Sequence, residues 1–109
     1  MIYFDNSATS PIDEEVVDVM LPYLREEYGN PSSKYYAKAA NAKKAVEDAR
    51  EKVAMLLGAK HEEIIFTAGA TESTNFIIKG YLDYRKYYGD GKNHIITSVV
   101  EHKATLNTC

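Results

Sequence analysis

Two short apolar runs flank one long helical pattern in the second half of the sequence, and this order constrains the fold more than any other feature. The first run, Ile64-Ile65-Phe66, forms the core of a predicted strand over Glu63 to Thr67, and a second strand is predicted from His94 to Val100. Between them the spacing predicts a helix from about Thr71 to Tyr88, with apolar residues at helical intervals: Ile77, Tyr81, Tyr84 and Tyr88. Strand, helix and strand in this order predict a right-handed βαβ unit.

Both predicted strands are apolar along most of their length, which is typical of strands covered on both faces of a sheet. Two strands alone would leave both sheet edges open, and open edges invite pairing. The sequence therefore predicts an α/β fold that is incomplete, with N-terminal helices followed by one βαβ unit of a larger sheet. A fourth helix is expected to open at residues 101–104.

The first half of the sequence predicts two helices. Asp13 is suited to cap the first, which has an apolar stripe and should kink at Pro22. A breaker cluster, Gly29-Asn30-Pro31-Ser32-Ser33, precedes a second helix from about Tyr36 to Leu57, and Gly58 is expected to end it. Residues 2–4 are predicted as a short strand or an anchored arm.

The composition limits the classes of partner. The chain has 109 residues, a formal charge of −3, and 45% hydrophobic residues. Mild acidity gives no reason to expect nucleic acid or an anionic membrane, and the N-terminus lacks signal-peptide features. A single cysteine, Cys109, cannot form an internal disulfide, which favours a reducing, cytoplasmic compartment. Three scattered histidines and one cysteine give no metal-binding spacing.

The turn between the first strand and the following helix is a candidate anion site. Gly69-Ala70-Thr71 lies where free amides and the positive end of the helix dipole converge, as in phosphate sites. The alternative is that Thr71 only caps its own helix, with Glu72 placed to suit the dipole. The turn lacks the Gly-Lys-Ser/Thr of a P-loop and the three glycines of a dinucleotide-binding turn.

His102 is the second candidate, because it lies just beyond the C-terminal end of a strand, where open α/β sheets bind ligands. Its imidazole could stack on a flat cofactor or transfer protons near neutral pH. The alternative interpretation is a capping or surface histidine. His61 and His94 are weaker candidates.

Four motifs in order give the sequence a family resemblance: YFDNSAT, GNPSS, EEIIFTAGATESTNFIIKG and NHIITSVVEHKATLNTC. Together they resemble the N-terminal portion of the cysteine desulfurases, in the class V branch of pyridoxal-phosphate (PLP) enzymes. The resemblance implies PLP as cofactor, with Ala70 and Thr71 at its phosphate and His102 stacked on its ring as a catalytic residue. It divides the chain into an arm, helix and loop over 1–35 and the start of the PLP-binding large domain over 36–109.

The resemblance also implies that the complete enzyme takes sulfur from L-cysteine, leaves alanine and holds the sulfur as a persulfide. Family members are homodimers and pass sulfur to acceptor proteins, for instance in iron–sulfur cluster assembly. The Schiff-base lysine, the aspartate that pairs with the pyridine nitrogen and the sulfur-accepting cysteine lie further along the family sequence, so this chain is expected to be inactive alone. Lys103 and Cys109 do not match those residues, and one extra residue follows the GNPSS loop.

Two other functions remain open on the sequence. The chain could be an assembly module that pairs its open strands with another copy or a C-terminal partner. It could also belong to another class V enzyme, such as a selenocysteine lyase or an aminotransferase.

Overall fold

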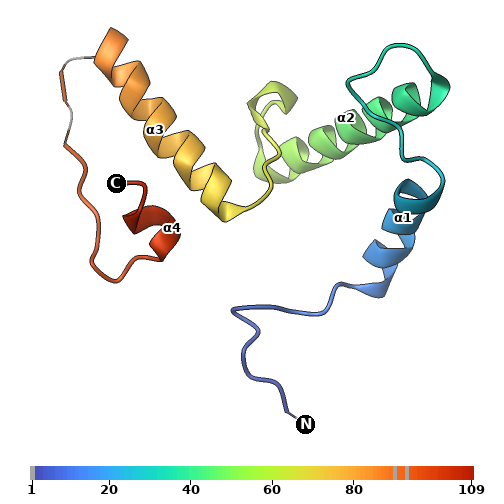
Figure 1. Cartoon of the computed structure of the whole chain (residues 1–109), viewed down its shortest axis with the longest axis horizontal. Helices are drawn as coiled ribbons and strands as arrows, with labels where there is room; N and C mark the ends of the chain where they lie inside the picture. The colour runs from blue at the N-terminus through green and yellow to red at the C-terminus, as the bar shows by residue number, and fades with distance from the viewer. Residues whose placement is uncertain (1, 90, 93) are drawn as a thin grey trace. The chain divides into compact units, whose positions relative to one another are not determined.

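The computed structural model describes residues 2–89, 91–92 and 94–109. Within these residues it contains the helices α1 (Glu14–Arg25), α2 (Ala37–Leu57), α3 (Ala70–Tyr88) and α4 (Lys103–Leu106), with a short 3-10 helix, η1 (His61–Glu63), after α2 (Figure 1). Contacts divide the chain into two compact units, residues 1–64 and residues 65–109.

In the first unit, α1 begins where the sequence predicts. The Asp13 carboxylate accepts a hydrogen bond from the Glu15 amide at 2.9 Å, and Glu14 and Glu15 place negative charge in the first turn. Pro22 lies inside the helix, and its carbonyl accepts from the amide of Glu26 at 2.8 Å just beyond the last helical residue. The cap and the favourable dipole charges explain why the helix starts at this point.

A tight corner connects α1 to α2. The Lys38 ammonium donates to the carbonyl of Glu26 at 2.6 Å and lies 4.3 Å from the centre of the Tyr28 ring. The amide of Asn30 donates to the Tyr36 hydroxyl at 3.0 Å. A Cβ atom at Gly29 would lie 2.1 Å from the Lys38 carbonyl oxygen. The close approach of these two backbone segments therefore requires glycine at position 29.

The second predicted helix is confirmed almost to the residue. Tyr36 precedes α2 in an extended conformation, and Gly58 ends it with φ 66°, a left-handed conformation that glycine adopts without steric cost. The guanidinium of Arg50 donates to the carbonyl of Ile64, which ties the chain after η1 back to α2. Among the described residues the buried set consists of three alanines of α2, Ala39, Ala42 and Ala54.

The N-terminal arm is anchored to itself. The Tyr3 hydroxyl donates to the Asp5 carbonyl at 2.9 Å and lies 2.8 Å from the Thr9 hydroxyl. The amide of Ala8 also donates to the Asp5 carbonyl, at 3.0 Å. Residues 3–9 therefore form a hydrogen-bonded turn rather than a strand.

The predicted βαβ unit is not confirmed. Glu63, expected to open the first strand, is the last residue of η1, and residues 64–67 continue as irregular chain. Residues 94–98 are irregular as well and residues 99–100 form a turn, so neither predicted segment belongs to a β-ladder within the described part of the chain. A strand is held by hydrogen bonds to a neighbouring strand, and an isolated pair of strands is marginal in water. Apolar sequence alone does not supply that neighbour.

The helix between those segments is confirmed. Helix α3 starts one residue before the predicted Thr71 and ends at Tyr88, with Gly89 as its C-terminal cap. Helix α4 begins after His102, inside the stretch where a fourth helix was expected, and it contacts α3 within the second unit (Figure 1).

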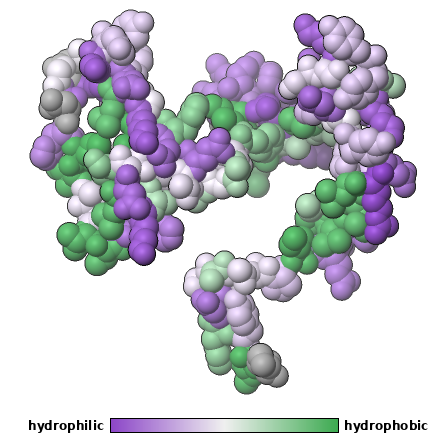
Figure 2. Space-filling model, viewed as in Figure 1, coloured by the Kyte–Doolittle hydropathy of each residue, from purple (hydrophilic) through white to green (hydrophobic). Residues whose placement is uncertain are grey.

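Large apolar side chains are exposed on both units (Figure 2). Leu24 of α1 is 70% exposed, and Ile96, Val99 and Val100 before α4 are 87–91% exposed. None of the described helices combines the length and apolar character that crossing a bilayer demands.

Candidate functional site

The predicted anion site lies at the start of α3. Gly69 is the N-terminal cap, and Ala70 and Thr71 are the first two residues of this 19-residue helix. The first helical hydrogen bond runs from the Ser73 amide to the Gly69 carbonyl, at 3.1 Å. The amides that precede Ser73 in the helix are those that a helix N-terminus offers to an anion, and the helix dipole adds positive potential there.

The capping interpretation of Thr71 does not hold in the structure. The cap is Gly69, with no side-chain hydrogen bond at the cap, and Thr71 lies inside the first turn. Its side chain is exposed, and its carbonyl accepts from the Asn75 side-chain amide at 2.9 Å. An exposed hydroxyl beside the first-turn amides is suited to donate to a bound anion.

A pair of hydroxyls, absent from the sequence-based predictions, closes the turn before α3. Thr67 Oγ1 and Ser73 Oγ lie 2.7 Å apart, and each also contacts the Gly69 carbonyl at 3.3 Å. Both residues are half-buried. The recognisable pattern is a threonine and a serine, six residues apart, on either side of the glycine that precedes the helix.

Glu72 makes a second closing contact. Its carboxylate accepts from the Ala68 amide at 2.5 Å, so the side chain reaches back over the turn from the third residue of the helix. A glutamate at the third helical position often accepts a hydrogen bond from a backbone amide at the start of the helix. A hollow of about 440 Å³ is lined by residues 68–72 and Asn75. The turn therefore presents an exposed concave surface held in shape by its own side chains.

His102 lies at the start of α4. Its Nδ1 atom accepts a hydrogen bond from the Ala104 amide at 3.1 Å, which makes His102 the N-terminal cap of that helix. The ring is exposed, and α4 contacts α3, whose first turn carries Ala70 and Thr71. The capping interpretation of this histidine is thus confirmed, and capping leaves the Nε2 side of the ring for another role.

The remaining candidates are dispersed. His61 Nδ1 lies 3.5 Å from a carboxylate oxygen of Glu62 on the exposed surface of the first unit, and His94 and Cys109 are exposed in the second. Asn30 accepts from the Ser32 amide at 2.9 Å, which shapes the loop between α1 and α2. Across the described residues, no cluster of three or more metal-ligating side chains is found.

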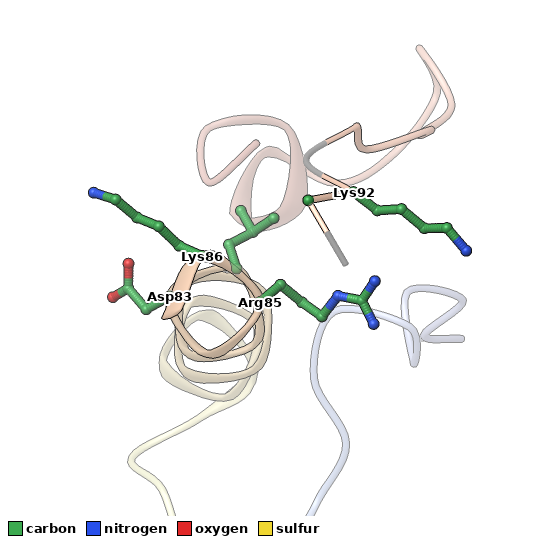
Figure 3. Close-up of a pocket in the computed structure, with 6 residues that line it drawn as sticks. Asp83, Arg85, Lys86 and Lys92 are labelled. Atoms are coloured by element: carbon green, nitrogen blue, oxygen red, sulfur yellow. The ribbon is translucent and has the colours of Figure 1, made fainter. Parts of the chain in front are cut away.

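A larger hollow, of about 480 Å³, lies at the other end of α3. Figure 3 shows Asp83 and Lys86 extending to one side of the helix and Arg85 and Lys92 to the other. Because these charged side chains diverge, the hollow offers no convergent set of groups for one ligand. The start of α3 remains the better candidate.

Comparison with known proteins gives a consistent result. The family model described as Aminotransferase class-V matches residues 2–109. The cysteine desulfurase IscS of Rickettsia typhi is 52% identical over 108 residues, which cover 99% of this chain and 26% of that protein. The probable mitochondrial cysteine desulfurase of Dictyostelium discoideum is 53% identical, over 99% of this chain and 23% of its own length.

A solved structure described as a NIFS-like protein superposes with a TM-score of 0.84 and 42% sequence identity. The match covers 98% of this chain and 28% of that one. The predicted resemblance to an N-terminal portion of the cysteine desulfurases is therefore confirmed. The chain spans about a quarter of the length of the curated relatives it matches.

Proposed function

Because this chain belongs to the class-V aminotransferase family, we propose that it forms the N-terminal part of a PLP-dependent cysteine desulfurase. The whole protein would take sulfur from L-cysteine, leave L-alanine and hold the sulfur as an enzyme persulfide. The observation that carries this proposal is the place of Ala70 and Thr71, in the first turn of a long helix, within a chain matched along nearly its whole length.

The residues at the start of α3 fit the phosphate of PLP. First-turn amides and an exposed Thr71 hydroxyl are donors, and the positive end of the dipole favours a dianion. The hydroxyl pair Thr67–Ser73 and the Glu72–Ala68 contact hold this turn in shape without using the first-turn amides. In the proposal, Ala70 and Thr71 hold the phosphate.

His102 has a different part in the proposal. Its flat ring would lie on the pyridine ring of PLP, with Nδ1 engaged by its own helix. Bound PLP supplies the electron sink that makes the chemistry at the amino-acid substrate accessible. The protein's own contribution from this segment is to bind the phosphate, orient the ring and place one imidazole beside it.

The wider context is proposed from the same family membership. We expect the apolar segments on either side of α3 to pair as strands of a larger sheet once the rest of the domain is present. A homodimer, a sulfur-acceptor protein, a role in iron–sulfur cluster assembly and a cytoplasmic location follow as further proposals. The predicted division at residue 36 stays a prediction.

Two alternatives keep a specific basis. A selenocysteine lyase or an aminotransferase of class V would use the same phosphate turn, because Ala70 and Thr71 do not select the substrate. An assembly module that needs a second copy or a C-terminal partner is favoured by the exposed apolar residues before α4.

The proposal is tested by PLP retention in the full-length protein. Replacing Thr71 by alanine removes one hydrogen bond to a charged group, a loss of roughly 1.5–3 kcal/mol. We expect PLP to dissociate at least about tenfold more readily, as measured by dialysis and visible absorbance. Thr71→Ser should retain PLP. Thr74→Ala is the matched control, since Thr74 directly follows Ser73 of the hydroxyl pair, and it should also retain PLP. Unchanged retention in Thr71→Ala would reject the site.

A further inference from the structure

The hydrogen bond that caps α4 fixes more than the start of a helix. The Ala104 amide donates to His102 Nδ1 at 3.1 Å, so Nδ1 uses its lone pair as an acceptor. A neutral imidazole has one N–H and one lone pair, on different nitrogens. With the lone pair on Nδ1, the proton of the neutral ring is on Nε2.

We infer that the backbone amide of Ala104 is a positioning group that holds His102 as the Nε2–H tautomer, so that this histidine presents a hydrogen-bond donor, rather than a base, to the PLP site. The inference about the tautomer stands on the geometry of α4. Its relevance to PLP rests on the proposed function.

The chemistry of the ring follows from this assignment. In the capped state Nε2–H can donate a hydrogen bond to an acceptor on the cofactor or the substrate while the ring stays neutral. To accept a proton, the ring must use Nδ1, and the Ala104 amide must first release that atom. Proton uptake by His102 is therefore coupled to the opening of the first turn of α4.

His61 provides an internal comparison. Its Nδ1 lies 3.5 Å from the Glu62 carboxylate, and the two side chains are 49% and 68% exposed. An ionised carboxylate only accepts hydrogen bonds, so this contact favours a proton on Nδ1. His102, with an amide donor beside Nδ1, is thus predicted to carry its proton on Nε2. His61, with a carboxylate acceptor beside Nδ1, is predicted to carry its proton on Nδ1 to a greater extent.

The test is ¹⁵N NMR of the imidazole rings in the 109-residue chain, at about pH 9, where a histidine with ordinary titration is neutral. His61→Gln and His94→Gln assign the three ring systems. Because free histidine itself favours Nε2–H, the deciding quantity is the change in tautomer ratio between variants. Ala104→Pro removes the donor amide, and Lys103→Pro is the matched control.

The control is well placed, because proline is tolerated at the first helical residue and His102, which would precede it, is already extended. We expect Lys103→Pro to keep the tautomer ratio of the unmodified chain. Ala104→Pro should shift the His102 tautomer ratio toward Nδ1–H by roughly fivefold, because the variant loses one ordinary hydrogen bond to Nδ1. In every chain that retains both His61 and the Ala104 amide, His61 should show a larger Nδ1–H fraction than His102. An equal tautomer ratio for His102 in the unmodified chain, Lys103→Pro and Ala104→Pro would overturn the inference.

A second measurement does not depend on proline, which also disfavours helical geometry at the residue before it. His102→Asn keeps a side-chain acceptor at the cap, whereas His102→Ala removes it. Hydrogen exchange at the Ala104 amide should stay close to that of the unmodified chain in His102→Asn and accelerate about fivefold in His102→Ala. Equal exchange in all three chains would show that the amide does not bond to the ring, and the inference would fall.

These measurements are made without PLP, so they separate the inference from the proposed function. If Thr71→Ala retains PLP normally, the proposed function fails while the tautomer assignment is judged by NMR alone. The opposite outcome is PLP loss as expected, with a His102 tautomer ratio that Ala104→Pro does not change and an Ala104 amide exchange rate that His102→Ala does not change. In that case the tautomer inference fails and the proposed function stands.

Discussion

Thr67 Oγ1 and Ser73 Oγ lie 2.7 Å apart, one on each side of Gly69, and both contact the Gly69 carbonyl. The two hydroxyls tie the incoming chain to the first turn of α3 at the point where the proposed phosphate site begins. The pair therefore links local backbone geometry to ligand binding.

Replacing Thr67 by valine preserves the shape of the side chain and removes its hydroxyl. We expect the turn to lose about 0.5–1.5 kcal/mol, because one hydrogen bond is no longer made. In the full-length protein, the rate of PLP release should rise by a factor of about two to ten, measured by stopped-flow absorbance. Thr67→Ser keeps a hydroxyl and should behave like the unmodified protein. Equal release rates for Thr67→Val would mean that the hydroxyl pair has no part in holding the turn.

Gly29 offers a prediction about stability alone. An alanine Cβ there would lie 2.1 Å from the Lys38 carbonyl oxygen, so the corner between α1 and α2 would have to open. In the full-length protein, we expect Gly29→Ala to lower the free energy of unfolding by about 1–3 kcal/mol, the usual cost of forced overpacking. Urea unfolding followed by circular dichroism measures the change.

Gly80 is the matched control for that substitution. It lies inside α3, and a Cβ added there would meet no atom within 4 Å beyond its chain neighbours and the backbone of its own helix. Gly80→Ala should stabilise the full-length protein by up to about 1 kcal/mol through helix propensity. If Gly29→Ala were neutral, the tight corner would not exist in solution.

His102→Asn separates capping from catalysis in the full-length protein. Asparagine can accept from the Ala104 amide, so α4 should keep its start, but the imidazole is lost. We expect sulfide release from L-cysteine to fall by about 10²–10⁴-fold, because asparagine can neither stack on PLP as an imidazole does nor take part in proton transfer. Circular dichroism and PLP content should be close to normal. Activity near the normal level would identify His102 as a cap and nothing more.

Association of the chain is expected from its exposed apolar residues. Ile96 is 90% exposed and Val99 is 91% exposed in a segment predicted to form a strand. Full burial of such side chains is worth roughly 1.5–3 kcal/mol each, so the 109-residue chain should form dimers or larger oligomers. Light scattering coupled to size-exclusion chromatography measures the mass.

Ile96→Lys should weaken that association, since it removes apolar surface and adds charge. Thr97→Lys adds the same charge at the neighbouring position without removing a large apolar side chain, and should have a smaller effect. A chain that is monomeric at all concentrations, or two variants that behave identically, would contradict the prediction.

The helices could be predicted closely from sequence because their ends are specified locally. Asp13 and Gly58 each mark a helix boundary that the structure confirms, through a carboxylate cap in the first case and a left-handed glycine in the second. The strands could not be secured in the same way. Residues 64–67 and 94–100 have the apolar content of strands, but a ladder depends on a partner that local sequence does not contain.

The site was predicted in part. The sequence placed Ala70 and Thr71 at a helix start, which the structure bears out as positions. It placed His102 beyond the end of a strand and among the residues that open a fourth helix; the structure has irregular chain and a turn in place of that strand, and His102 is the cap of the helix. It did not reveal the Thr67–Ser73 contact, because that contact depends on how the chain turns at Gly69. It also could not show which nitrogen of His102 faces its own helix, since ring orientation is set by the Ala104 amide in three dimensions.

The burial of only three alanines within the described residues has a calorimetric consequence. The heat-capacity increment of unfolding arises mainly from apolar surface newly exposed to water, and ordinary domains show about 12–15 cal/mol/K per residue. A chain whose large apolar side chains are already hydrated has little such surface left to expose. Its increment should be far smaller, and heating should produce a gradual loss of helix without a sharp endotherm.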